Sequence, residues 1–296
     1  MKKFQVFTDS TSDCLMDFRQ QFEIEYLKMY VNLGDNAYDA DLDWGMISPL
    51  DFYNGMRNSK PTSTGLIKRI ELEEKFTKTL EQGLDILYVA CSSALSGSVN
   101  VARIVAEELL ENYPDRKIVC IDSLRSNFAE GMIAIDAAKM ALDGMDILEV
   151  ASIIDEAKLH YQCVATVDTL DYLKRAGRVK ASKAFFGNLM GVRPIIYEDF
   201  EGNNYSFKKV KGRKASLDYL VSFVKENILR ADEATVTIEH ADCLKDAAYV
   251  KDQIVKLVNP KEVRVQMLGP IIGSTIGPGA ITVNFYGNKV NITSGE

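Results

Sequence analysis

Short apolar runs, rich in β-branched residues, alternate with amphipathic stretches through the first half of the chain. This alternation constrains the fold more than any other feature. Residues 4–7, 86–91 and 117–121 have the composition of buried strands, and the last two lead into stretches with helical period. Such an order is typical of a mostly parallel sheet with helices packed on it. We therefore expect an α/β fold.

The pattern changes after a predicted helix at residues 147–160. Residues 192–197 and 205–210 flank a turn rich in Gly and Asn, which predicts a pair of antiparallel strands. We predict a two-domain α/β fold. An N-terminal domain, residues 1–160, holds a mostly parallel sheet with flanking helices, and an α+β domain, residues 161–296, follows it. A ligand site is expected in the cleft between them.

Composition and charge exclude several classes of protein. The chain has 296 residues, 47% hydrophobic and 26% charged, which is typical of a globular protein. Its net charge of -7 has the wrong sign for binding nucleic acid. The five cysteines form no Cys-x-x-Cys pair, so we expect a reducing, cytoplasmic location and no metal site. No run approaches the roughly 18 apolar residues that indicate a membrane span.

Four hydroxyl-rich segments, expected to be loops, are candidates for ligand binding: residues 9–13, 61–64, 92–97 and 273–279. The first and third follow a predicted strand and precede a predicted helix, where open α/β sheets place ligands. Helix N-termini and hydroxyl groups together bind anions. Ser, Thr and Asp are also ordinary helix caps, so a purely structural role remains the alternative for each segment.

The Gly- and Pro-rich run at residues 269–279 matches neither a dinucleotide fingerprint nor a Walker loop. It imitates a nucleophile elbow, but no histidine follows it to act as the base. Nucleotide cradling is therefore not indicated, and acyl-enzyme hydrolysis is disfavoured. At residues 169–179 a basic cluster ends a predicted helix. It either interacts with the helix dipole or meets a phosphate or an acidic partner.

Five motifs in order resemble the DegV family of bacterial lipid-binding proteins, which includes the fatty-acid-carrier subunits of fatty acid kinases. TDSTSD at residues 8–13 is similar to TDSTAD, PTST at 61–64 to PTTS, and SSALSGS at 92–98 to SSxLSGT. LKRAGRV at 173–179 is similar to LxxGGRI, and GSTIGPG at 273–279 to GxHxGPG. The resemblance implies a DegV-like fold of two α/β domains. It also implies a non-catalytic protein that needs no cofactor and holds a long-chain fatty acid between those domains.

The resemblance also implies roles for particular residues. The carboxylate of the fatty acid would be held by Thr62 or Ser63 together with Ser93 or Ser96, and by the position of Thr275. Thr275 stands where the family has histidine, and exchanging a charge-assisted bond for a neutral one weakens the site by about 1 kcal/mol. Arg178 matches an arginine implicated in docking to the kinase subunit.

The acyl chain requires a long apolar pocket, because burying it gains about 0.8 kcal/mol per methylene. Candidate lining residues are Phe128, Met132, Phe185, Phe186 and Met190. The alternative for these side chains is ordinary domain core. Two other functions remain open: a phosphoryl- or acyl-transfer enzyme, which the missing nucleotide motif and histidine base disfavour, and a binder of a smaller carboxylated metabolite.

Overall fold

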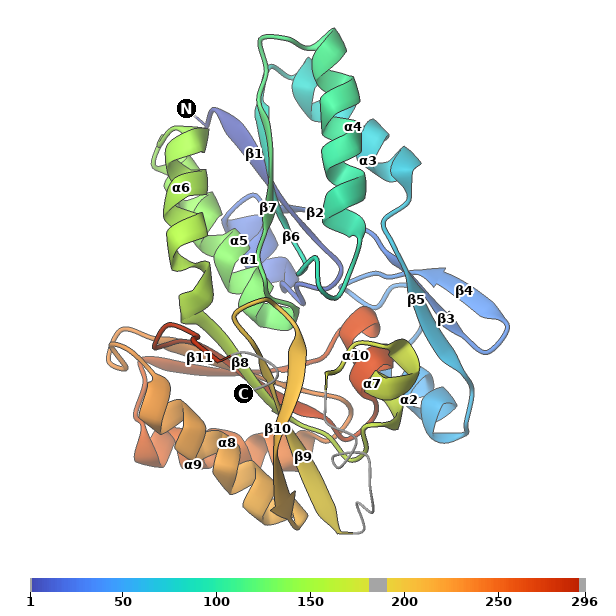
Figure 1. Cartoon of the computed structure of the whole chain (residues 1–296), viewed down its shortest axis with the longest axis vertical. Helices are drawn as coiled ribbons and strands as arrows, with labels where there is room; N and C mark the ends of the chain where they lie inside the picture. Colours follow the sequence, from blue (N-terminus) through green and yellow to red (C-terminus); the bar gives the residue numbers. More distant parts are fainter. Residues whose placement is uncertain (1, 181–190, 293–296) are drawn as a thin grey trace.

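Figure 1 shows the computed structural model of the protein, which describes residues 2–180 and 191–292. A parallel sheet of four strands forms the upper part of this view, in the order β2 (Glu25–Leu27), β1 (Phe4–Asp9), β6 (Asp85–Ala90) and β7 (Ile118–Asp122). Helices α3 (Arg69–Glu81) and α4 (Ser98–Asn112) pack on one face, and helices α5 (Asn127–Leu142) and α6 (Ile147–Ala157) pack on the other. The parallel α/β arrangement expected from the sequence is confirmed.

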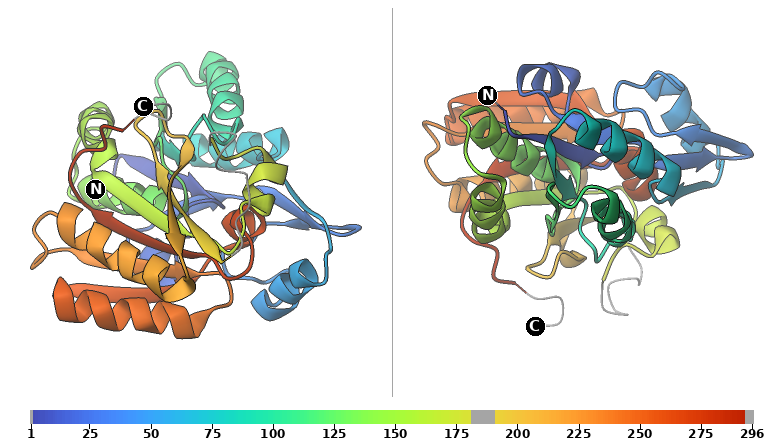
Figure 2. Two further views of the ribbon diagram at one scale, coloured as in Figure 1. Left: turned by 60° about the horizontal axis from the view of Figure 1, so that its bottom comes forward. Right: turned by 90° about the horizontal axis from the view of Figure 1, so that it is seen from above.

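A mixed sheet of six strands forms the lower part. Its order is β10 (Asn204–Lys211), β9 (Val192–Glu198), β8 (Tyr161–Thr166), β13 (Ile281–Tyr286), β11 (Thr235–His240) and β12 (Glu262–Met267). Only the pair β11–β12 is parallel. Helices α8 (Arg213–Asn227) and α9 (Leu244–Leu257) cover one face of this sheet (Figure 2). Its opposite face is turned toward the parallel sheet.

A third, small sheet joins the two halves. Its strands are ordered β4 (Asn36–Asp39), β3 (Tyr30–Leu33) and β5 (Thr62–Gly65). It packs with α2 (Pro49–Arg57) against α10 (Pro270–Ile276). The Tyr53 hydroxyl of α2 donates a hydrogen bond of 2.8 Å to the Leu268 carbonyl oxygen. The remaining described helices are α1 (Met16–Gln21), the 3₁₀ turn η1 (Lys158–His160) and α7 (Asp171–Ala176).

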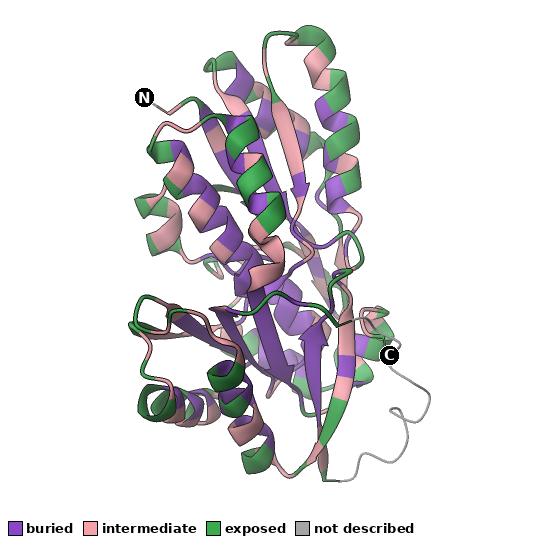
Figure 3. Ribbon diagram, turned by 60° about the vertical axis from the view of Figure 1, so that its left-hand side comes forward, coloured by how far each residue is buried: buried purple, intermediate pink, exposed green. Residues whose placement is uncertain are grey.

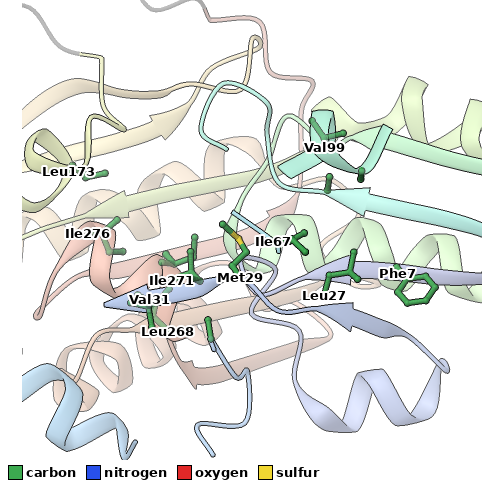
Figure 4. Close-up of a cluster of buried hydrophobic side chains, with 14 of the residues drawn as sticks. Phe7, Leu27, Met29, Val31, Ile67, Val99, Leu173, Leu268, Ile271 and Ile276 are labelled. Carbon is green, nitrogen blue, oxygen red and sulfur yellow. The ribbon is translucent and has the colours of Figure 1, made fainter. Parts of the chain in front are cut away.

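The largest apolar core crosses from one half of the chain to the other. Phe7 and Met29 belong to the same buried cluster as Leu268 and Ile271 (Figure 4). Buried residues accordingly run without a break through the middle of the molecule (Figure 3). Each large sheet nevertheless takes its strands from one side of residue 160. The division at that residue remains a prediction.

The structure confirms the predicted hairpin, because β9 and β10 pair antiparallel. It corrects two segments that were expected to be loops. Thr62–Gly65 is strand β5, which pairs with β3. Pro270–Ile276 is helix α10, which begins with a proline at its first turn and ends at Gly277, whose φ is +86°. A proline near the start and a glycine just past the end are ordinary helix boundaries.

Candidate functional site

A cavity lies between the two large sheets, below the carboxyl ends of the parallel strands. Thr11 and Cys91, which follow β1 and β6, line it from above, and Ala165 and Ile196 line it from strands β8 and β9. The cavity has a volume of about 150 Å³. The cavity therefore occupies the place where open α/β sheets bind ligands.

Apolar side chains form the middle of the cavity. Met29 comes from the loop before β3, Leu173 from α7, and Ile271 and Ile276 from α10. Figure 4 shows these four side chains on segments that are far apart in the sequence. All four are also members of the core cluster that joins the two halves. The middle of the cavity is consequently a gap in an apolar core, suited to a hydrocarbon.

One side of the cavity reaches the surface, and this side is called the mouth here. The lining residues that keep partial exposure are Thr64, Gly65, Leu66, Leu95, Arg178, Asn204 and Thr275. Arg178 supplies the positive charge, and its Nε donates a hydrogen bond of 3.1 Å to the Leu95 carbonyl oxygen. Among the described lining residues the one carboxylate, Glu198, is buried. The mouth is thus positively charged.

Another part of the cavity wall is both buried and polar, and it adjoins the mouth where Glu198 pairs in register with Asn204. Ser126, Asn127, Cys163, Glu198 and Thr282 line it, and each is 5% exposed or less. The Asn127 side-chain amide donates to Cys163 Sγ at 2.9 Å. These residues are called the inner end here. The wall of the cavity therefore combines a cationic mouth, an apolar part and a buried polar part.

Glu198 is the most unusual residue of the inner end. The Ser126 hydroxyl donates to its Oε1 at 2.5 Å, whereas its Oε2 is buried with no hydrogen-bond partner among residues 2–180 and 191–292. Burial raises the pKa of Glu198 to about 7, although the nearby Arg125 guanidinium and the Ser126 hydrogen bond oppose the rise. Glu198 is therefore a carboxyl group close to its titration point at neutral pH.

Side chains of the opening motif, residues 8–13, also connect the strands of the parallel sheet. Asp9 accepts hydrogen bonds from the Tyr88 hydroxyl at 2.7 Å and from the Cys91 amide at 3.2 Å, which ties β1 to β6. The Thr11 hydroxyl lies 2.5 Å from Asp9 Oδ1 and 2.6 Å from Glu130 Oε2. Because a hydroxyl has one hydrogen, it can donate to only one of these oxygens. A neutral Glu130 would donate in return, and burial raises the pKa of Glu130.

Close packing against Tyr30 explains why residue 65 is glycine, which the sequence alone did not show. A Cβ placed on it would fall 1.7 Å from the Tyr30 ring, so the backbone of β5 passes directly over that ring. This close approach sets one wall of the mouth, and any side chain at residue 65 would displace Tyr30 or close the entrance.

The predicted carboxylate residues are not all in one place. Ser96 and Thr275 line the cavity, while Thr62 and Ser63 line a smaller pocket that adjoins the mouth and shares Thr275 and Arg178 with it. Ser93 is exposed and lies outside both linings.

Each predicted hydroxyl that lines the cavity already has a partner. The Thr275 hydroxyl donates to the Ile271 carbonyl oxygen at 2.9 Å, and the Ser96 hydroxyl donates to Ser98 Oγ at 3.0 Å. In the adjoining pocket the Thr62 hydroxyl donates to the Ser274 carbonyl oxygen at 3.1 Å. These hydroxyls would have to rotate to donate to a carboxylate, and Arg178 carries the fixed charge.

Two of the predicted acyl-chain residues are described by the structure, and neither lines this cavity. Phe128 and Met132 line a different hollow beside α5 and α6, and the Phe128 ring packs on Phe18 with centroids 5.5 Å apart. Phe185, Phe186 and Met190 lie outside the described residues.

Sequence reasoning missed Glu198 and Cys163, which belong to no motif. No signal in the sequence marks these two residues, because alternation along a strand is the same for a solvated face and for a buried one.

The fold and the cavity define a class of protein: an α/β protein with an enclosed, largely apolar ligand cavity between its two sheets. A family model described as "Uncharacterised protein, DegV family" matches residues 3–288. A DegV domain-containing protein of Clostridium perfringens is 36% identical over 288 residues, covering 97% of this chain and 99% of that protein. The chain belongs to the DegV family.

Two solved structures illustrate the similar fold. A DegV family protein from Thermus thermophilus, described by its fatty acid binding, is 22% identical with a TM-score of 0.87, covering 97% of this chain and all of that one. DegV from Bacillus subtilis, described as a fatty acid binding protein, is also 22% identical, with a TM-score of 0.84 and the same coverage. At these identities the likeness establishes the shared fold.

Membrane-spanning helices and metal-binding clusters are both absent from the described residues. None of the helices in this part of the chain combines the length and the apolar character needed to cross a membrane. Within the same residues, no three His, Cys, Asp or Glu side chains are grouped so that they could hold a metal ion.

Proposed function

We propose that this protein is a carrier, not a catalyst, that holds one long-chain fatty acid in the cavity between its sheets. The observation that carries the proposal is the cavity between the two large sheets, which has a cationic mouth and an apolar middle. Burying an acyl chain of about sixteen carbons gains on the order of 10 kcal/mol, which needs an apolar space of this kind. The fatty acid binding described for structural relatives of the same fold supports the assignment.

The carboxylate of the ligand lies at the mouth in this proposal. Arg178 lines the mouth beside Thr275, so its guanidinium supplies the charge that a histidine would otherwise bring. A hydrogen bond to a charged group contributes about 1.5–3 kcal/mol, more than the roughly 1 kcal/mol lost with the histidine. Thr275 and Ser96 add neutral donors to the carboxylate, and Thr62, Ser63 and Ser93 belong to the surrounding surface.

Presentation of the bound carboxylate to a separate kinase is the second part of the proposal. The partial exposure of Arg178 and the exposed side chain of Arg175 place two cations around the mouth. A docked kinase would find the carboxylate at the surface and the acyl chain buried. The reaction at the carboxylate would then take place in the cytoplasm, without release of the lipid.

A substitution that fills the middle of the cavity tests the first part. Ala165→Phe places a ring among the lining side chains and should weaken fatty acid binding by at least about tenfold, which corresponds to about 1.4 kcal/mol. Ala215→Phe on the exposed face of α8 is the matched control and should bind like the wild type. Equal affinity of Ala165→Phe and wild type, measured by calorimetry with delipidated protein, would place the lipid elsewhere.

Arg178→Gln separates carboxylate binding from kinase docking. A role at the carboxylate predicts about tenfold weaker fatty acid binding. A role in docking alone predicts unchanged lipid retention and slower phosphorylation by the kinase. Retention and phosphorylation that both match the wild type would contradict both assignments.

A further inference from the structure

The inner end of the cavity has the wrong chemistry for a plain hydrocarbon tail. A fatty acid whose carboxylate lies beside Arg178 and whose chain fills the same cavity shares that cavity with Ser126, Asn127 and Glu198. Glu198 is 2% exposed, and its Oε2 has no hydrogen-bond partner in the described part of the chain. A methylene chain cannot pair with this oxygen, and leaving a buried polar group unpaired is unfavourable.

The polar character of the inner end is built by several elements. Ser126 and Asn127 come from the start of α5, Cys163 from β8, Glu198 from the end of β9 and Thr282 from β13. The Ser126 hydroxyl already donates its hydrogen bond to Glu198 Oε1, and the Thr282 hydroxyl donates to Glu239 Oε2 at 3.0 Å. Neither hydroxyl hydrogen is therefore available to Glu198 Oε2 in this arrangement.

We propose that the preferred ligand is a hydroxylated long-chain fatty acid whose hydroxyl, in the middle or distal part of the chain, pairs with Glu198. This inference rests on the proposed function, because it assumes a carboxylate at the mouth. A hydroxyl both donates and accepts, so it pairs with either protonation state of Glu198. It also meets the neighbouring Asn127 amide, which a hydrocarbon cannot do.

Other polar tails fit the inner end less well. A second carboxylate would bring negative charge beside Glu198 in a buried site, where like charges repel strongly. An ammonium group would be buried near the Arg125 guanidinium, which is itself fully buried and donates to the Tyr161 and Asp199 carbonyl oxygens. A neutral hydroxyl avoids both penalties.

Binding of a matched set of C18 acids to delipidated protein tests the inference. The set contains stearic acid, its 3-hydroxy derivative, and the isomers with hydroxyl at carbon 9, 10 or 12. We expect at least one of the last three isomers to bind about tenfold tighter than stearic acid, because a hydrogen bond to a charged group is strong. The 3-hydroxy acid should show no such gain, since its hydroxyl stays near the mouth.

Variants identify the residue responsible. Glu198→Leu should remove the preference for the hydroxylated isomer and bind stearic acid at least as tightly as wild type. Glu201→Leu, an exposed glutamate three residues away, is the matched control and should keep the wild-type preference.

The outcomes separate this inference from the proposed function. Tight binding of stearic acid with no gain for any hydroxylated isomer overturns the hydroxyl inference and leaves the carrier function standing. Failure of every acid to bind overturns both. The wild-type series decides the inference even if Glu198→Leu fails to fold.

Discussion

Alternate residues of the same strands build the two faces of the six-stranded sheet, yet the faces bury different chemistry. The face under α8 and α9 carries Val283, Phe285 and Ile238. The face toward the parallel sheet carries Thr282, Asn284 and Glu239, and these are equally buried. On that face the Glu239 carboxylate accepts hydrogen bonds from Gln266, Thr282 and Asn284 at 2.8–3.0 Å.

The two faces of the six-stranded sheet differ in what they contribute: the apolar face contributes to stability, and the polar face also borders the cavity. The apolar face is filled by helices that belong to the same half of the chain. The polar face meets the other half and borders the cavity, so its groups take hydrogen-bond partners from both halves of the chain. A buried polar face holds its shape only while those hydrogen bonds are complete.

Truncating a buried side chain of the apolar face should have the largest effect on the free energy of unfolding. Phe285 is fully buried and packs against Phe223 with ring centroids 6.3 Å apart. Phe285→Ala should lower the free energy of unfolding by about 3–5 kcal/mol, through lost burial and a remaining cavity. Urea unfolding measures the loss. Phe200→Ala, at a residue 38% exposed, is the control and should change stability by less than about 0.5 kcal/mol. Equal losses in the two variants would contradict the account.

Titration of Glu198 should give the next largest change in the free energy of unfolding. Its pKa of about 7 lies above the ordinary value of 4.5, so between these pH values the folded protein holds a proton that the unfolded chain has lost. This contribution to stability is complete below about pH 4.5 and is lost as pH rises through 7. Wild type should therefore lose on the order of 3 kcal/mol more than Glu198→Gln between those pH values. Parallel stability profiles of the two proteins, from urea unfolding across pH, would show that Glu198 is not buried as described.

Replacing an apolar by a polar side chain, or the reverse, at two neighbouring residues of β13 should give the smallest changes in the free energy of unfolding. Val283→Thr places a hydroxyl in the apolar face and should cost about 2 kcal/mol. Thr282→Val removes a hydrogen bond to Glu239 and should cost about 1 kcal/mol. Both variants are nearly isosteric, so thermal unfolding reports the chemistry of each face. A gain in stability from Thr282→Val would mean that the polar face is dispensable.

The sequence predicted the fold well because its signals are local. The strands at residues 86–91 and 117–121 and the pairing of residues 192–197 with 205–210 follow from composition, period and turn residues. The segments at residues 61–64 and 273–279 were misjudged because Ser, Thr, Gly and Pro favour loops in isolation. Here β5 gains its partners from β3, and α10 gains its packing from α2 and the small sheet. Tertiary contacts overrode local preference.

The site was predictable at its mouth and not at its inner end. Ser96, Arg178 and Thr275 belong to motifs, and all three line the cavity. Glu198 does not, because a polar residue that alternates with apolar ones in a strand is ordinarily on the solvent side. Only the packing of the second half of the chain on the first buries it. Sequence pattern cannot distinguish a solvated face from one that is buried between domains.

Native mass spectrometry of the purified protein, before and after organic extraction, tests the central claim most directly. The account predicts one long-chain fatty acid per chain, released on extraction and absent from the Ala165→Phe variant. A protein that carries no lipid, and that takes up none when fatty acid is added after extraction, would contradict it.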